Sequence, residues 1–218
     1  MLNIIRLLVL ASVTFGSTSA NGGFVNGSFE NPTLAPGTFT NFTGGSTAIS
    51  GWTVVGVDSA LVNHYVQNGI TFQAQNGSNH IDLAGVMSNS KTSGVTQNIV
   101  TQIGTRYELS FYVGSATDNN FFFASTVDVT IAGGPRMSFT NPTVPTNRVD
   151  WRLFTTSFTA TSTLTSITFQ NGSAANNFSS LLDNVSLIVV PEPSSIILFT
   201  LGTVAICVKN RRRSACRG

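Results

Sequence analysis

The middle of the chain alternates apolar and polar residues with a period of two. The alternation is clearest over residues 106–113 and 126–131, and it recurs over 154–158 and 167–169. This period is typical of strands with one buried face. Shorter stretches of the same kind lie at 54–57, 61–66, 79–83, 95–101 and 182–189. Because turn-forming residues separate them and no apolar period of 3.6 is sustained between residues 21 and 190, the pattern predicts an all-β fold, an antiparallel β-sandwich or jelly roll.

The first twenty residues do not follow this pattern. Residues 1–20 have Arg6 as their one charge, an apolar run over residues 7–13, and the small residues Ser-Thr-Ser-Ala at 17–20. This arrangement predicts a secretory signal peptide with cleavage after Ala20, although a first core strand would also be apolar. The folded domain is therefore expected to span residues 21–190.

The C-terminal residues 191–218 also lie outside the pattern. Pro191, Glu192 and Pro193 precede an uncharged run over residues 194–208, which is followed by Lys209 and by three consecutive arginines, Arg211, Arg212 and Arg213. An apolar segment with a basic end predicts a transmembrane helix whose basic side stays in the cytoplasm. Since about 20 residues are needed for a span, residues 188–190 are expected to extend the run. A buried helix hairpin is the alternative, but the basic cluster argues against it.

This C-terminal arrangement resembles the PEP-CTERM sorting signal. The resemblance implies that exosortase, a membrane-embedded protease, cuts the chain near Pro191-Glu192-Pro193. It also implies export, transient anchoring in the inner membrane, and a final place at the cell surface or in the extracellular matrix.

Charge and cysteine content exclude several classes of function. The whole chain has a net charge of +2, but residues 21–190 contain five Lys and Arg against eight Asp and Glu. The domain is thus mildly acidic, and we expect no nucleic-acid partner. Both cysteines lie beyond residue 206, which excludes a thiol enzyme or a zinc site with cysteine ligands from the domain.

Four short motifs in the domain occur in a characteristic order. They are Asn-Gly-Ser-Phe-Glu at 26–30, Gly-Trp at 51–52, Ile-Asp-Leu at 81–83 and Leu-Asp-Asn-Val-Ser at 182–186. This order resembles the DUF642 and choice-of-anchor domains, which are similar to galactose-binding-like β-sandwiches. The resemblance implies a structural calcium ion between the first and last strands, with Glu30 and Asp183 as ligands. Glu30 as a surface acid and Asp183 as a turn cap are the alternatives.

Some side chains suit carbohydrate recognition. His80 and Asp82 are two residues apart, so on a strand they share a face, as a polar pair in a sugar site or as a solvated pair. Flat aromatic rings stack on sugars, and the candidates are Trp52, Tyr65, Tyr107, Tyr112 and Trp151. Tyr107 is expected in the core, and Trp52 could instead anchor the edge of the sandwich.

No catalytic motif stands out. The chain contains no Gly-x-Ser-x-Gly sequence and no histidine pair at metal-ligand spacing. We therefore expect a secreted, non-enzymatic surface or matrix protein that binds exopolysaccharide or a cell-surface glycan. The alternatives are a polysaccharide hydrolase that uses a pair of carboxylates, and a purely architectural or adhesive protein.

Overall fold

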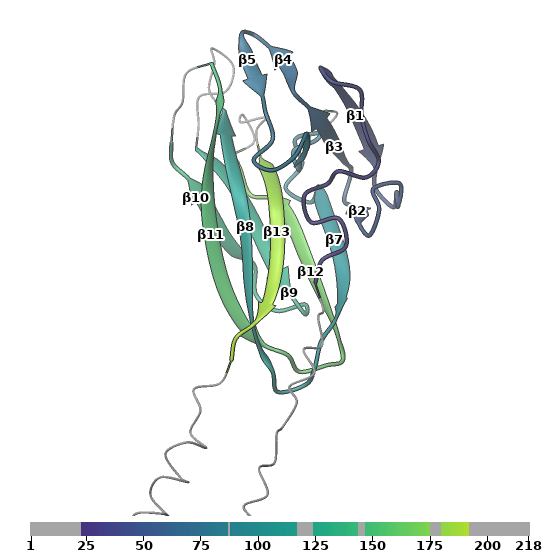
Figure 1. Cartoon of the computed structure of the whole chain (residues 1–218), viewed down its shortest axis with the longest axis vertical. Coiled ribbons are helices and arrows are strands. Elements are labelled where there is room, and N and C mark those ends of the chain that lie inside the picture. The colour runs from purple at the N-terminus through teal and green to yellow at the C-terminus, as the bar shows by residue number, and fades with distance from the viewer. Residues whose placement is uncertain (1–22, 87, 117–123, 144–146, 175–179, 192–218) are drawn as a thin grey trace, which may run out of the picture.

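The structure, a computed structural model, describes residues 23–86, 88–116, 124–143, 147–174 and 180–191. Two antiparallel sheets pack face to face, with their long strands side by side (Figure 1). The six-stranded sheet has the order β1 (Thr38–Thr43), β3 (Asp58–Asn63), β6 (Asn79–Asp82), β13 (Leu181–Val189), β8 (Arg106–Ala116) and β11 (Val149–Thr159). The five-stranded sheet has the order β10 (Met137–Asn141), β9 (Ser125–Ile131), β12 (Leu164–Asn171), β7 (Gly94–Val100) and β2 (Thr53–Val55). The predicted antiparallel β-sandwich is confirmed.

The inner faces of the two sheets form the main core, as the alternation predicts. On β8, Tyr107, Leu109, Phe111 and Val113 are buried, whereas the residues between them lie on the outer face. They meet inward side chains of the facing sheet such as Phe169, whose ring lies 5.3 Å from that of Phe111. Each fully buried side chain of this size contributes about 1.5–3 kcal/mol, so this interface dominates the stability of the domain.

A second, smaller apolar cluster lies outside the sandwich. The hairpin of β4 (Tyr65–Gln67) and β5 (Ile70–Phe72) folds over the outer face of the six-stranded sheet, at the end that is uppermost in Figure 1. Ile70 and Phe72 pack there against outward residues of the sheet, including Val62, Val149 and Leu181. This upper part of the outer face is therefore covered.

Three local expectations are wrong. Residues 24–29, which suggest a short first strand, form turns in which Asn26 and Phe29 both have a φ of 56°. Residues 38–43, expected in a loop that runs to Ser50, form β1, and residues 137–141, for which the alternation predicts no strand, form β10. Ile188 and Val189 belong to β13, where they pair with Glu108 and Tyr107, so they do not extend a transmembrane segment.

Among the described residues, no helix is long and apolar enough to cross a membrane. The expected signal peptide and the uncharged run over residues 194–208 lie outside the described part, as do Glu192, Pro193 and the arginines at 211–213. Pro191, the last described residue, is exposed beyond the end of β13.

Candidate functional site

Two acidic side chains hold the loop that follows β5. Asp183 Oδ2 accepts hydrogen bonds from the backbone N–H groups of Gln75, at 2.8 Å, and Asn76, at 3.0 Å. Glu30 Oε1 accepts from the N–H groups of Ser78, at 2.9 Å, and Asn79, at 2.8 Å. Residues from the start of the domain, from its last strand and from this loop therefore meet at one place.

The sequence Asp-Asn at 183–184 explains the local geometry. The pairing of β13 with β8 shifts its register between Asp183 and Ser186, and Asn184 adopts a φ of 48°. Asparagine tolerates this left-handed conformation better than most residues. The bulge lets the Asn184 Nδ2 donate to Gln75 Oε1 at 2.8 Å, while its backbone N–H donates to Asp183 Oδ1 at 2.6 Å.

The environment of Asp183 disfavours its charge. The side chain is fully buried, and burial raises its pKa to about 7 against the lowering effect of the N–H groups of residues 75, 76 and 184. The negative charge of Glu30 raises the pKa further, so the two carboxylates lie close enough to repel each other. Asn79 Oδ1 is buried without a hydrogen-bond partner.

This set of oxygen atoms fits a hard cation. Calcium prefers carboxylate, amide and backbone carbonyl oxygens. Here Glu30 accepts from the N–H of Asn79, whose side-chain oxygen has no partner among the described residues, and Asp183 accepts from Gln75 in the same loop. A bound cation would offset the repulsion between Glu30 and Asp183. Within the described residues, no group of three or more His, Cys, Asp or Glu side chains is placed to hold a metal, so amide and carbonyl oxygens would have to complete the coordination.

Gly77 gives a direct test of the packing around Glu30. Its φ is +71°, and a Cβ atom there would collide with the Glu30 carboxylate. We expect Gly77→Ala to lower the free energy of unfolding by about 1–3 kcal/mol, since backbone strain and the collision add. Gly69→Ala is the matched control, because Gly69 has a φ of +81° with open space around it. Equal urea midpoints for the two variants would show that the contact with Glu30 contributes nothing.

His80 and Asp82 lie on the same outer face, as their spacing predicts, but His80 is covered. His80 is fully buried, neither ring nitrogen has a hydrogen-bond partner among the described residues, and its ring meets Trp151 edge-on at 5.5 Å. Burial, and secondarily the charge of His64, lower the pKa of His80 to about 3. Burial raises the pKa of Asp82 to about 7, with a smaller rise from Asp58, against the N–H groups of Ala84 and Ser180. His80 therefore offers no open contact to a ligand in this conformation.

The aromatic candidates are in different environments. Trp52 is buried in the main core. Tyr65 is half-buried and meets Phe39 edge-on at 4.9 Å. Trp151 lies under the covering loop, where its Nε1 donates to Gln73 O at 3.2 Å. Tyr112 is half-buried on the outer face of β8, with no ring contact or hydrogen bond from the described residues.

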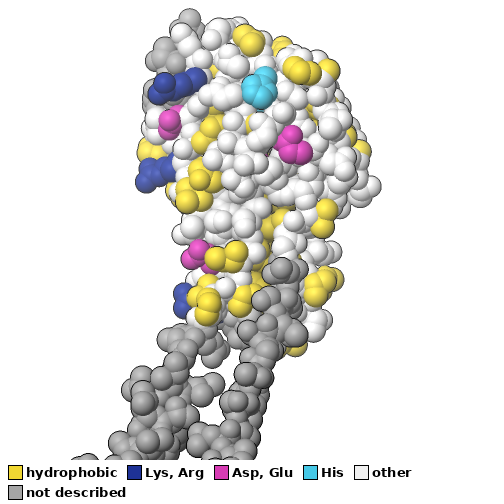
Figure 2. Space-filling view, viewed as in Figure 1, with side chains coloured by type: hydrophobic (Ala, Val, Ile, Leu, Met, Phe, Trp, Pro, Cys, Tyr) yellow, Lys and Arg dark blue, Asp and Glu magenta, His cyan; other side chains and the backbone are white. Residues whose placement is uncertain are grey.

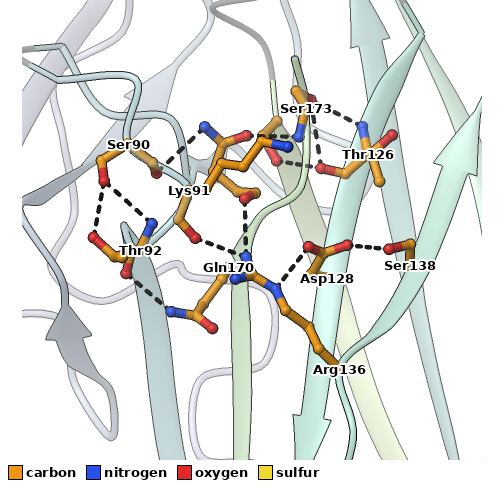
Figure 3. A network of polar contacts seen from close by, with 11 residues as sticks. Ser90, Lys91, Thr92, Thr126, Asp128, Arg136, Ser138, Gln170 and Ser173 are labelled. Atoms are coloured by element: carbon orange, nitrogen blue, oxygen red, sulfur yellow. Dashed lines mark hydrogen bonds and ion pairs between the residues drawn. The ribbon is translucent and has the colours of Figure 1, made fainter. Parts of the chain in front are cut away.

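The outer face of the other sheet is polar but satisfied internally (Figure 3). Arg136 Nε lies 2.7 Å from Asp128 Oδ2, and the Ser138 hydroxyl donates to Asp128 Oδ1 at 2.6 Å. The Arg136 guanidinium also donates to Lys91 O, at 2.7 Å, and Asn171 O, at 3.1 Å. These bonds tie β9, β10 and β12 to the 88–93 loop. The sequence analysis does not predict this network, because its hydrogen bonds join residues far apart in the chain. Arg136 and Lys91, for example, are 45 residues apart.

Comparisons with known proteins identify the domain. The family model described as "Protein of unknown function (DUF642)" matches residues 22–188, most of the chain. The chain belongs to the DUF642 family. A model of the PEP-CTERM protein-sorting motif matches residues 189–213, which indicates export and sorting to the cell surface. Both resemblances stated from the sequence are thereby confirmed.

One curated relative is a very large protein. The chain is 30% identical over 199 residues to halomucin of Haloquadratum walsbyi, a match that covers 87% of this chain and 2% of halomucin. The chain thus spans a small fraction of that relative, and the properties of whole halomucin do not transfer to it.

The solved structures that resemble this DUF642 domain include carbohydrate-binding modules. The family 35 carbohydrate binding module of Clostridium thermocellum is 13% identical, with a TM-score of 0.41 over 69% of this chain and 99% of that one. The CBM22-1 xylan-binding domain of Paenibacillus barcinonensis is 13% identical, with a TM-score of 0.43 over 73% and 99%. An exo-β-1,3-galactanase of Phanerochaete chrysosporium is 21% identical, with a TM-score of 0.41 over 70% and 29%. Similarity this distant assigns no ligand.

Proposed function

We propose that this exported DUF642 domain is a non-enzymatic module that binds a polysaccharide of the cell surface or extracellular matrix through the open part of its six-stranded sheet. Tyr112 carries the proposal. Its side chain lies on the outer face, half-buried, beside the exposed Leu153, its register partner on β11. A flat apolar ring stacks on the C–H face of a sugar, whose hydroxyl groups need polar neighbours.

Those neighbours are present on the adjacent row of the sheet. Ser110 of β8 pairs with Thr155 on one side and with Ser186 on the other, so three hydroxyl groups lie across three strands beside Tyr112. In Figure 2, charged side chains of both signs lie along the left edge of this side of the molecule, and the surface between them and the other edge is mostly uncharged.

We expect Tyr112→Ala to weaken polysaccharide binding roughly tenfold, a loss of about 1.4 kcal/mol of binding free energy. Tyr112→Phe should retain most of the affinity because it keeps the ring. Affinity electrophoresis and glycan arrays with the exported domain would measure the effect. The matched control is Thr168→Ala, a hydroxyl on the outer face of the five-stranded sheet, where Thr168 lies between Thr96 and Thr130. A loss of binding in Thr168→Ala but not in Tyr112→Ala would place the site on the wrong sheet for this proposal.

The positions of the acidic residues disfavour a hydrolase. Of the seven Asp and Glu in the described part, five accept hydrogen bonds within the fold: Glu30, Asp58, Asp82, Asp128 and Asp183. The other two, Glu108 and Asp150, lie far apart, since Asp150 pairs with Ser115, seven residues along β8 from Glu108. Seven residues of strand span about 23 Å, whereas glycosidase carboxylates lie about 5–10 Å apart. Hydrolysis of a matrix polysaccharide by the domain would overturn this inference, and a folded domain that binds no glycan would indicate an architectural protein.

We further propose that Glu30 and Asp183 hold a structural calcium ion, which would stabilise the loop over the outer face. The fit of the oxygen atoms described above supports this proposal. The ion would act on the stability of this loop, and because Asp183 is the register partner of Tyr112, the calcium site would adjoin the proposed glycan surface.

The sorting motif supports a proposal about the route. We propose that exosortase cuts near Pro191, Glu192 and Pro193 after the tail has held the exported protein in the inner membrane. Pro191, the last described residue, is exposed beyond the last strand, which supports access of a protease to the start of the motif.

A further inference from the structure

Exposed apolar side chains gather at the end of the sandwich where β13 finishes, the lower end in Figure 1. Val100 and Leu164 are cross-strand partners on β7 and β12 and are 65% and 52% exposed. Ile103, in the turn between β7 and β8, is 61% exposed, and Ile188 and Val189 are 56% and 38% exposed. These five make up nearly half of the eleven large hydrophobic side chains exposed in the described part. We refer to them as the lower apolar rim.

The turns that carry the rim are held in place. The β7–β8 and β11–β12 turns exchange backbone hydrogen bonds from Thr101 to Thr163, from Gly104 to Ala160 and from Ala160 to Thr105. The N–H of Gln102 also donates to the Tyr107 hydroxyl at 2.9 Å. Ile103 is therefore presented to solvent on a well-bonded turn.

Charge is sparse at this end. Residues 94–105 and 157–171 contain no Lys, Arg, Asp or Glu. Arg106 and Glu108, near the start of β8, are the nearest charged residues in the described part, and the Arg106 guanidinium donates to the Ser157 hydroxyl at 2.9 Å. An apolar groove of about 350 Å³ opens on the same end, lined by Ile131, Pro135, Met137, Phe158 and other residues of the β9–β10 and β11–β12 connections. In Figure 2, hydrophobic side chains are visible at this end.

The C-terminal chain leaves the fold at the rim. The N–H of Val190 donates to Arg106 O at 2.9 Å, which fixes the last residue before Pro191 beside the β7–β8 turn. Three residues, 191–193, then precede the uncharged run over 194–208. Three extended residues reach about 10 Å at most. If the run enters a membrane, the lower end of the sandwich must lie within that distance of it.

The uncharged run over residues 194–208 is short for a bilayer, which would bring the lower end of the sandwich closer to the membrane. As a helix, the fifteen residues from 194 to 208 extend about 22 Å, against about 30 Å for the hydrocarbon core of a bilayer. Ile188 and Val189, which could have lengthened it, are paired within β13. A short span is relieved by local thinning of the bilayer or by drawing the flanking residues inward.

We propose that the lower apolar rim inserts into the interfacial layer of the membrane that holds the tail, so that the uncleaved protein stands on the bilayer with its long strands upright. The partner is a lipid surface. The proposal rests on the membrane anchoring proposed above, and it implies that cleavage near residue 191 releases the rim together with the domain.

Lipid quenching of tryptophan fluorescence tests this in the full chain. The Ile103→Trp variant is reconstituted in phosphatidylcholine vesicles with and without brominated acyl chains, and the emission of the unsubstituted protein, from Trp52 and Trp151, is subtracted. We expect brominated lipid to lower the added emission about twofold, since interfacial side chains reach about 5–10 Å into the boundary. Val66→Trp, on the exposed hairpin strand β4 at the opposite end, is the matched control and should not be quenched.

Flotation of the same vesicles distinguishes a failure of the membrane anchoring from a failure of the rim proposal alone. Protein that does not float with the vesicles would overturn the membrane anchoring and the rim proposal with it. Protein that floats with equal emission from Ile103→Trp in both lipids would overturn the rim proposal alone. Equal quenching at positions 66 and 103 would also overturn it, because the domain would then lie on the membrane without the predicted orientation.

Discussion

Trp52→Ala should destabilise the domain more than any substitution at the proposed glycan surface. The indole stacks on Phe24, with ring centres 5.2 Å apart, and on Phe29, at 5.1 Å, and it meets Phe169 at 6.0 Å. Its Nε1 donates to Asn26 O at 3.0 Å, so it also fixes the first turn of the domain. Truncation of a buried tryptophan costs about 3–5 kcal/mol, a large part of the roughly 5–15 kcal/mol that stabilises a domain.

Urea denaturation at neutral pH measures this effect. Trp52→Phe is the informative control, because it keeps a ring in the stack and removes the hydrogen bond to Asn26, a loss of about 1 kcal/mol. Tyr112→Ala should lower the midpoint less than Trp52→Ala does, since the Tyr112 side chain is only partly buried. A Trp52→Ala midpoint equal to that of Tyr112→Ala would contradict the core role. Loss of glycan binding by Trp52→Ala would accordingly report unfolding and would not locate a site.

The long strands could be predicted because burial on one face leaves a period of two in the sequence. Tyr107 was assigned to the core on this basis, and its ring is buried against Phe158. The same signal is weak at the edges of the sheets. β1 has the sequence Thr-Phe-Thr-Asn-Phe-Thr and is mostly exposed, and β10 is a five-residue edge strand next to glycine and proline. Edge strands bury too little surface to show a strong alternation.

The candidate site could be predicted less completely than the fold. The shared face of His80 and Asp82 follows from local spacing, but the burial of His80 depends on distant residues such as Trp151, whose ring it meets. No local pattern contains that information. Glu30 and Asp183 were paired through the order of four motifs, and the structure brings both onto one loop. Whether they bind calcium stays a prediction.

In the presence of a chelator, the stability of the domain should fall as the pH rises from about 4 to 8. Folding raises the pKa of Asp82 and of Asp183 from 3.8 to about 7, so their stabilising contribution is complete below pH 4 and is lost as the pH rises through 7. Folding lowers the pKa of His80 from 6.5 to about 3, which has the opposite effect between those values. The effect of the two acids on the free energy of unfolding outweighs that of the one histidine. Asp183 alone, whose pKa rises from 3.8 to about 7, accounts for about 4 kcal/mol of that free energy.

Calcium bound by Glu30 and Asp183 should oppose this fall in stability with rising pH. The ion binds the charged carboxylates, and protons compete with it at low pH. At pH 8, calcium at about a hundred times its dissociation constant should add about 2.7 kcal/mol to the free energy of unfolding, and at pH 4.5 it should add little.

Asp183→Asn should abolish the calcium response and flatten the pH dependence. Asp82→Asn is the matched control: it should flatten the pH dependence and keep the calcium response, since Asp82 bonds to Ala84 and not to the 75–79 loop. Thermal melts at both pH values, with calcium or with EGTA, measure all four outcomes. An equal melting temperature at pH 8 with and without calcium would refute the metal site and leave Glu30 and Asp183 as acids that hold the loop by their hydrogen bonds alone.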